Sequence, residues 1–176
     1  TSTTIGASLH EMVHTFGVPH SMDPHCIMTR GIDRFNRFFT LYEPPSKKRK
    51  EPYDFSDDEI ARYCKAIANN LAVTRFFALD QREYREGDPP KISYDRDRDE
   101  IRITSETGIG YLSCEPLFAR PGTRDCIAID PNKPAPKKIT LTPADWAAFK
   151  NEDFQVRAID TAARVTTDRE PLKPDR

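Results

Sequence analysis

The sequence has no long hydrophobic run and almost no excess of charge of either sign. No stretch approaches the roughly 20 consecutive apolar residues that a membrane-spanning helix needs. The 27 basic and 28 acidic residues leave a net charge of −1, so nothing in the charge balance points to nucleic acid or anionic lipid. We therefore expect no nucleic-acid partner and no membrane span, and the oligomeric state stays open.

The chain is also poor in apolar residues and in closely spaced cysteines. Only 37% of its 176 residues are hydrophobic and 15 are prolines, which favours a modest core with long irregular segments. None of the four cysteines belongs to a Cys-x-x-Cys pair. Cys114 and Cys126 could close a loop as a disulfide, but unpaired thiols fit the pattern equally well, so the redox compartment stays open.

Residues 3–16 predict an amphipathic helix. Its apolar side chains recur at three- and four-residue spacing, at Ile5, Leu9, Met12, Val13 and Phe16. Gly17 follows this stripe, and Pro19 makes continuation unfavourable, so the helix should end there. The chain starts at Thr1, close to this helix, and we expect it to be a piece of a longer protein.

A linker and a second helix are expected next. Residues 43–54 hold three prolines and the basic run 47–50, a composition that cannot pack a core. The basic run weakly resembles a nuclear-import signal, although a solvated linker is the simpler interpretation, and localisation stays unknown. Ser56 and Glu59 form a capping box, which predicts a helix from there to about residue 79.

The character of the chain changes after a Gly-Asp-Pro-Pro break at 87–90. Residues 90–162 predict a β-rich extension, and the polar tail 163–176 is expected to be disordered. The expected strands are 92–94, 101–103, 109–112, 127–129 and 154–159, with a short helix after Thr142 that points Trp146 and Phe149 inward. Together with the helical part at 1–85, this gives an α+β fold.

One constellation in the first helix carries chemistry. His10 and His14 lie four residues apart, so both imidazoles face the same side of the helix and suit one zinc ion. Glu11 lies about 100° further round the helix, where its carboxylate can act as a general base on a zinc-bound water. Gly17 can turn the chain back, which lets His20 supply a third ligand. A fourth position would remain for water and substrate.

The spacing resembles the signature of the metzincin zinc peptidases. Residues 10–20 spell H-E-x-x-H-x-x-G-x-x-H, and Met28 follows eight residues after His20. The resemblance implies that Met28 belongs to a Met-turn, which supports the zinc site from below without being a ligand. An ordinary core methionine is the alternative interpretation.

Three further segments are similar to a fungal family of zinc metallopeptidases, some of which carry a jacalin-like lectin domain. They are Gly-Val-Pro-His at 17–20, Ile-Met-Thr-Arg-Gly at 27–31 and Ser-Glu-Thr-Gly-Ile at 105–109. The resemblance implies that residues 1–85 are the C-terminal portion of a metzincin-like catalytic domain, whose sheet-bearing half would lie upstream. No lectin domain is recognisable in this chain.

The sequence therefore predicts a zinc-dependent metallopeptidase that hydrolyses a peptide or protein substrate. One alternative is a catalytically inactive zinc-binding or interaction module derived from a metallopeptidase. Another is a truncated product without a stable fold. The intact general base Glu11 favours the enzyme, because a purely structural zinc site has no use for a base.

Overall fold

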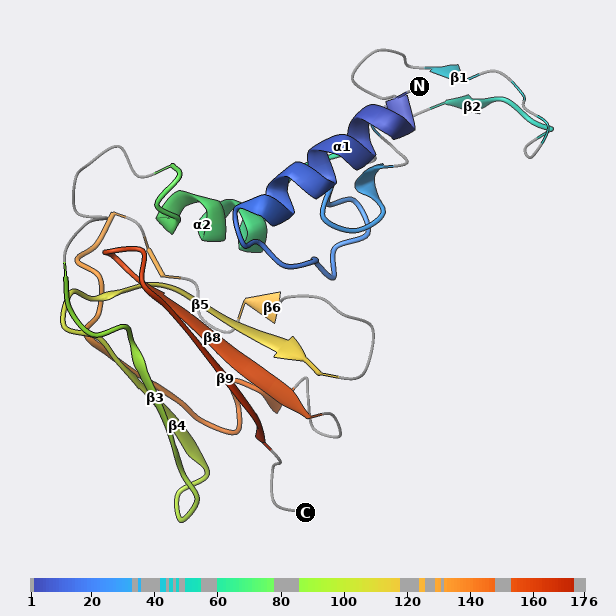
Figure 1. The fold of residues 1–176 in the computed structure, drawn as a ribbon. Helices are drawn as coiled ribbons and strands as arrows, with labels where there is room; N and C mark the ends of the chain where they lie inside the picture. The colour runs from blue at the N-terminus through green and yellow to red at the C-terminus, as the bar shows by residue number, and fades with distance from the viewer. Residues whose placement is uncertain are drawn as a thin grey trace. The chain divides into compact units, whose positions relative to one another are not determined.

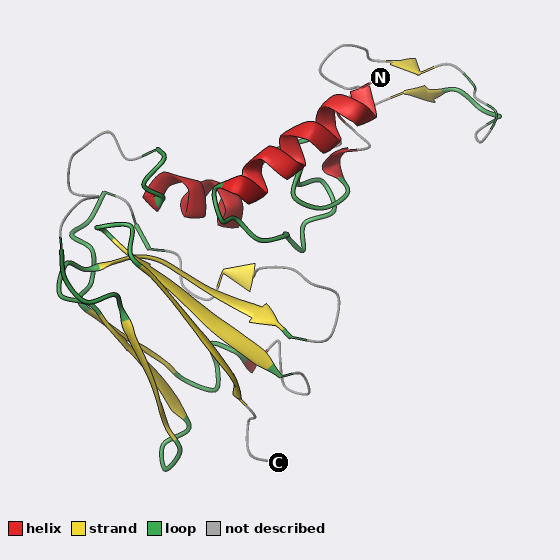
Figure 2. Ribbon diagram, in the orientation of Figure 1, coloured by secondary structure: helices red, strands yellow, loops and turns green. Residues whose placement is uncertain are grey.

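The computed structural model describes most of the chain, and within the described residues it has a mixed α/β fold (Figure 1, Figure 2). The described residues are 2–32, 35, 42–43, 45, 47, 50–54, 60–77, 86–117, 124–125, 129–130, 132–147 and 153–172. The chain forms two compact units, residues 1–67 and 68–176, whereas the sequence placed the division at 85–90. Neither described helix has the length and hydropathy needed to cross a membrane.

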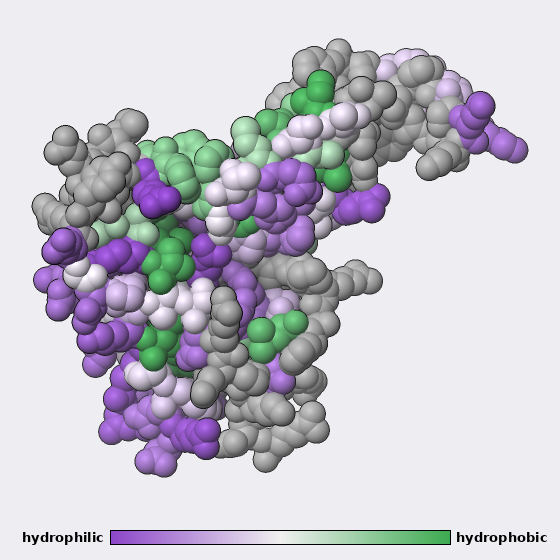
Figure 3. Space-filling model, in the orientation of Figure 1, coloured by the Kyte–Doolittle hydropathy of each residue, from purple (hydrophilic) through white to green (hydrophobic). Residues whose placement is uncertain are grey.

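The first unit is built on helix α1, Ser2–Thr15, close to the predicted range. The amide of Gly17 bonds to the carbonyl of His14, and Gly17 takes a φ of 76°, so the left-handed residue ends the helix as expected. Val13 is buried, but Ile5 and Met12 are 49% and 47% exposed. The apolar stripe is therefore only partly covered, and Figure 3 shows small apolar areas among hydrophilic side chains on the face it draws.

A loop with little regular structure follows α1 and folds back against it. A Cβ atom on Gly6 would lie 2.7 Å from the carbonyl oxygen of Ile32, so the helix and this loop approach each other more closely than any side chain would allow. At the two ends of the predicted linker, β1 (Tyr42–Glu43) and β2 (Tyr53–Asp54) form a short antiparallel pair.

Helix α2 spans Lys65–Val73 and is shorter than predicted. The expected capping pair, Ser56 and Glu59, lies outside the described residues. Residues 60–64 are not helical, which corrects the prediction of a helix through them. The physical reason is a long-range pairing, because the backbone of Arg62 bonds to the loop after α1 and is not available to a helix.

The second unit contains two antiparallel sheets that enclose its core. The smaller has the order β3-β4-β7, with β3 Lys91–Asp95, β4 Glu100–Thr104 and β7 Lys138–Leu141. The larger has the order β6-β5-β8-β9, with β5 Ile109–Pro116, β6 Arg124–Asp125, β8 Phe154–Asp160 and β9 Val165–Leu172. The core cluster includes Ile101, Ile103, Leu112, Leu141, Trp146, Phe154 and Val156.

Most of the expected β-structure is confirmed, with two corrections. The predicted strands at 92–94, 101–103, 109–112 and 154–159 lie within β3, β4, β5 and β8. Of the strand predicted at 127–129, only Ile129 is described, and it is not in a strand. Residues 165–172 form β9, so the prediction of a disordered tail is wrong there. Pairing with β8 supplies the backbone partners that local composition does not reveal.

Two further predictions concern single residues of this unit. Trp146 is buried as expected. Residues 143–146 form turns, Ala147 is 3₁₀-helical, and Phe149 lies outside the described residues. The side chain and the amide of Thr142 both bond to Asp145, which closes this turn. Cys114 is disulfide-bonded; its expected partner, Cys126, lies outside the described residues.

Candidate metal centre

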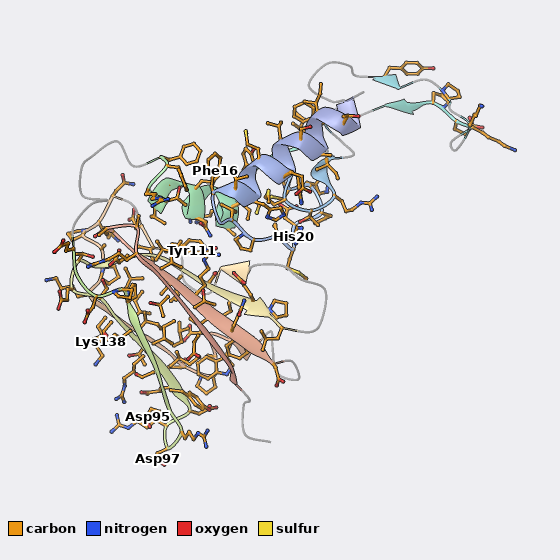
Figure 4. The ribbon with its side chains drawn as sticks, viewed as in Figure 1. Phe16, His20, Asp95, Asp97, Tyr111 and Lys138 are labelled. Atoms are coloured by element: carbon orange, nitrogen blue, oxygen red, sulfur yellow. The ribbon has the colours of Figure 1, made fainter. Side chains whose placement is uncertain are left out.

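Three imidazole rings converge in the first unit. Helix α1 supplies His10 and His14, and the loop after the helix carries His20, whose side chain Figure 4 labels. The Nε2 atom of His10 lies 3.1 Å from Nε2 of His14 and 3.2 Å from Nε2 of His20. The third distance, from His14 to His20, is 3.3 Å. The predicted trio is therefore brought together as one group that could hold a metal ion.

Backbone carbonyls fix two of these rings. The Nδ1 atom of His10 lies 2.7 Å from the oxygen of Ile27, and Nδ1 of His14 lies 2.8 Å from the oxygen of Val18. Because a carbonyl can only accept, each Nδ1 must carry the hydrogen, which leaves a lone pair on Nε2 of a neutral ring. Both rings thus present an acceptor nitrogen to the same point.

The spacing of the three nitrogens fits a cation better than it fits hydrogen bonding. In their neutral form, with Nδ1 hydrogens directed to these carbonyls, His10 and His14 would point lone pairs at each other, and two lone pairs cannot form a hydrogen bond. Tetrahedral zinc with Zn–N bonds of 2.0–2.1 Å would separate its nitrogen ligands by about 3.3 Å. The observed triangle of 3.1, 3.2 and 3.3 Å is close to that value. The donor set is also the one that zinc prefers in open sites.

Electrostatics favours the neutral, ligating form of His20. Burial lowers the pKa of His20 below its usual 6.5, and the neighbouring His14 and His10 lower it further. The carboxylate of Glu11 acts in the opposite direction on the same pKa. The balance leaves His20 unprotonated over a wider pH range, as a metal ligand must be.

Glu11 lies on α1 beside His10, and its side chain is exposed. Its influence on the pKa of His20 shows that the carboxylate is within electrostatic reach of the three-histidine group. An accessible carboxylate next to a metal centre can exchange protons with water and substrate.

Met28 is fully buried in the turn that follows the three histidines. The amides of Thr29 and Gly31 both bond to the carbonyl of Cys26, which closes the turn. The amide of Ser21, the residue after His20, bonds to the carbonyl of Met28. The segment around Met28 is thus attached to the chain that carries the third histidine.

The sequence prediction missed the contacts that hold this arrangement. The acceptors for His10 and His14 are backbone carbonyls, which leave no signal in residue type. The backbone of Arg62 bonds to the loop on both sides of Cys26, and its guanidinium pairs with Asp23 at 3.2 Å. Such pairing between distant segments is set by tertiary structure and not by local pattern.

Comparison with known proteins identifies a family for this chain. The family model Metallopep, described as "Putative peptidase family", matches residues 1–110. No curated protein and no solved structure matches the chain. The family match covers more than half of the 176 residues and contains all three clustered histidines. The chain therefore belongs to this peptidase family.

Proposed function

We propose that this protein is a zinc-dependent metallopeptidase that hydrolyses peptide bonds of peptide or protein substrates. The observation that carries the proposal is the triangle of Nε2 atoms, two of them on rings whose Nδ1 atoms are fixed by backbone carbonyls. Family membership supports peptidase chemistry over the inactive binding module.

In this proposal His10, His14 and His20 hold the ion. A bound zinc ion would supply Lewis acidity to the peptide carbonyl and lower the pKa of a water molecule. The carbonyls of Ile27 and Val18 keep two of the rings in the ligating tautomer and orientation. The protein thereby provides the geometry before substrate arrives.

Glu11 is the proposed general base. One oxygen of its exposed carboxylate would accept a proton from the attacking water. The carboxyl group would then deliver this proton to the leaving nitrogen of the peptide. The position directly after His10 allows this without competing for the ion, because the side chain leaves α1 about 100° away from that histidine.

We also assign the site to the metzincin type, with residues 1–85 as the C-terminal portion of the catalytic domain and the β-rich part as an extension. The support is the motif at 10–20 and the position of Met28. Met28 is buried, and the carbonyl of the preceding residue, Ile27, accepts the hydrogen bond that orients His10. The resemblance to the fungal metallopeptidases belongs to the same proposal.

Two variants test the function. Metal analysis of the purified wild type should find one zinc per chain, and His20→Ala should lose it. Glu11→Gln should keep its zinc and lose about 10²–10⁴-fold in the rate of cleavage of an unfolded protein substrate. A Glu11→Gln variant as active as wild type would refute the role of the base. Zinc-loaded wild type without cleavage would instead favour the inactive module.

A further inference from the structure

Two free thiols meet beside the candidate metal centre, although 38 residues separate them in the sequence. The side chains of Cys26 and Cys64 are hydrogen-bonded to each other. The amide of Cys64 also donates to the sulfur of Cys26 at 3.3 Å. Cys26 is fully buried, whereas Cys64 is partly exposed.

Backbone pairing holds the two segments together. Cys26 and Arg62 form an isolated parallel bridge. The amide of Ile27 bonds to the carbonyl of Arg62 at 2.8 Å, and the amide of Arg62 bonds to the carbonyl of His25 at 3.2 Å. A disulfide requires its two Cα atoms to lie within about 7 Å and its Cβ atoms to face each other. The bridge at Arg62, two residues before Cys64, and the bond from the Cys64 amide to the Cys26 sulfur bring the two cysteines side by side.

The surroundings give the two thiols different reactivity. The hydrogen bond from Cys26 lowers the pKa of Cys64 to about 6; a hydrogen bond from Ser21 lowers it further, while burial and the carboxylate of Asp23 oppose the shift. The same hydrogen bond between the thiols raises the pKa of Cys26, and burial of the Cys26 side chain raises it further. The partly exposed Cys64 is therefore the more acidic of the two thiols and the buried Cys26 the less acidic, the order expected of an attacking and a resolving cysteine.

We propose that Cys26 and Cys64 form a peroxide-sensitive dithiol that closes reversibly to a disulfide. The thiolate of Cys64 attacks one oxygen of a hydroperoxide; an S–O bond forms, the O–O bond breaks, and the departing oxygen leaves as water or alcohol after taking a proton. The sulfur of Cys26 then attacks the sulfur of Cys64. The S–S bond forms, the S–O bond breaks, and hydroxide leaves with the proton of Cys26 as water. The two thiols lose two electrons in total, and the hydroperoxide gains them.

The bridge would have a defined place in the fold. It would join the turn around Met28 to the segment immediately before α2. Cys26 directly precedes Ile27, whose carbonyl accepts the hydrogen bond from His10. The dithiol is thus separate from the metal-binding nitrogens but covalently next to a residue that orients one of them.

Peptide mapping tests the proposal directly. The reduced full chain would be treated with hydrogen peroxide, alkylated with N-ethylmaleimide under denaturing conditions and digested with trypsin. Trypsin leaves Cys26 in the peptide 1–30 and Cys64 in the tripeptide 63–65. We expect these two peptides to appear cross-linked, with the loss of two hydrogen atoms, and to separate on treatment with dithiothreitol. Full alkylation of both thiols after peroxide, in a chain that melts cooperatively, would overturn the proposal.

Two variants test the order of the steps. In Cys26→Ser the reactive sulfur has no partner, so Cys64 should accumulate as sulfenic acid that dimedone captures. In Cys64→Ser the remaining thiol is buried, and we expect it to stay reduced at the peroxide dose that oxidises wild type. Rapid oxidation of Cys26 in that variant, while its circular dichroism remains that of wild type, would contradict the assigned roles.

Discussion

The ring of His10 donates a hydrogen bond from Nδ1 to the carbonyl oxygen of Ile27, 17 residues further along the chain, at 2.7 Å. This single contact links the helix that carries two of the clustered histidines to the turn that buries Met28. It makes the orientation of an imidazole depend on the conformation of a loop, and the predictions for the first unit follow from that dependence.

Met28→Ala should destabilise the first unit. The side chain is fully buried, and truncation of a buried methionine costs about 2–5 kcal/mol through lost packing and the cavity left behind. Met12→Ala is the matched control, because Met12 is 47% exposed and sits on a helix that accepts alanine readily. Urea titration of both variants measures the difference. Equal losses would show that the turn around Met28 does not contribute packing.

Gly17→Ala should weaken metal binding as well as stability. Gly17 has a φ of 76°, and a side chain in that left-handed conformation costs about 1–2 kcal/mol. The strain would displace His20, three residues later, from the other two rings. Gly17→Asn is the control, since asparagine tolerates this conformation better. Competition with a chromogenic zinc chelator should rank the affinities as wild type, then asparagine, then alanine; an alanine variant with wild-type affinity would contradict the role of the turn.

The alkylation rate of Cys64 should depend on pH in a way that its neighbour controls. Only the thiolate reacts, so the rate rises with pH and should reach its midpoint near the pKa of about 6. Cys26→Ala removes the main hydrogen bond and should move the midpoint upward, toward that of an ordinary thiol. The nearby carboxylate of Asp23 cannot take the place of the Cys26 donor. It raises the pKa of Cys64, and it is itself paired with Arg62.

Cys26→Ser is the matched control for this experiment. Its hydroxyl can still donate to the thiolate of Cys64, so the midpoint should rise less than in the alanine variant. Stopped-flow alkylation with iodoacetamide between pH 5 and 9 would measure all three proteins. The same midpoint in wild type and Cys26→Ala would show that the hydrogen bond between the thiols does not set the pKa.

Asp160→Asn should destabilise the second unit. The Asp160 carboxylate is fully buried, pairs with Nε of Arg164 at 2.7 Å and accepts the amide hydrogens of Ala162 and Arg164. Removing one partner of a buried pair costs about 3–5 kcal/mol, because the other charge is left uncompensated.

Asp130→Asn provides the exposed counterpart. Asp130 pairs with Lys133 at 3.6 Å on the surface, and such pairs contribute at most about 1 kcal/mol. Thermal melting should therefore separate the two variants clearly. A melting temperature of Asp160→Asn within experimental error of wild type would mean that the turn between β8 and β9 does not depend on the ion pair.

The three-histidine cluster was predictable because its geometry is local. Four-residue spacing on a helix places His10 and His14 on one face, and one glycine turn returns His20 to them. The end of α1 followed from the same glycine. The strands with alternating apolar residues, such as β4 and β8, were predictable for a similar reason, since the pattern records which face meets the core.

Features that depend on distant pairing were not predictable. Helix α2 begins later than predicted because the backbone of Arg62 bonds to the loop after α1. The local sequence does not indicate these bonds. Strand β9 carries the charged residues Asp168 and Arg169, which suggested a solvated tail; its pairing with β8 outweighs that composition. The thiol pair Cys26 and Cys64 required the tertiary structure for the same reason.

The close approach of Gly6 to Ile32 bears on how an ion would enter the site. Together with the bonds that anchor the rings of His10 and His14, it pins the loop to the helix at three points before any ligand arrives. The rings of His10 and His14 have then lost most of their conformational entropy during folding. Ordering them would add little to the free-energy cost of binding an ion. Metal binding would therefore need no refolding of the chain, and its rate would depend on the access of the ion to the three rings.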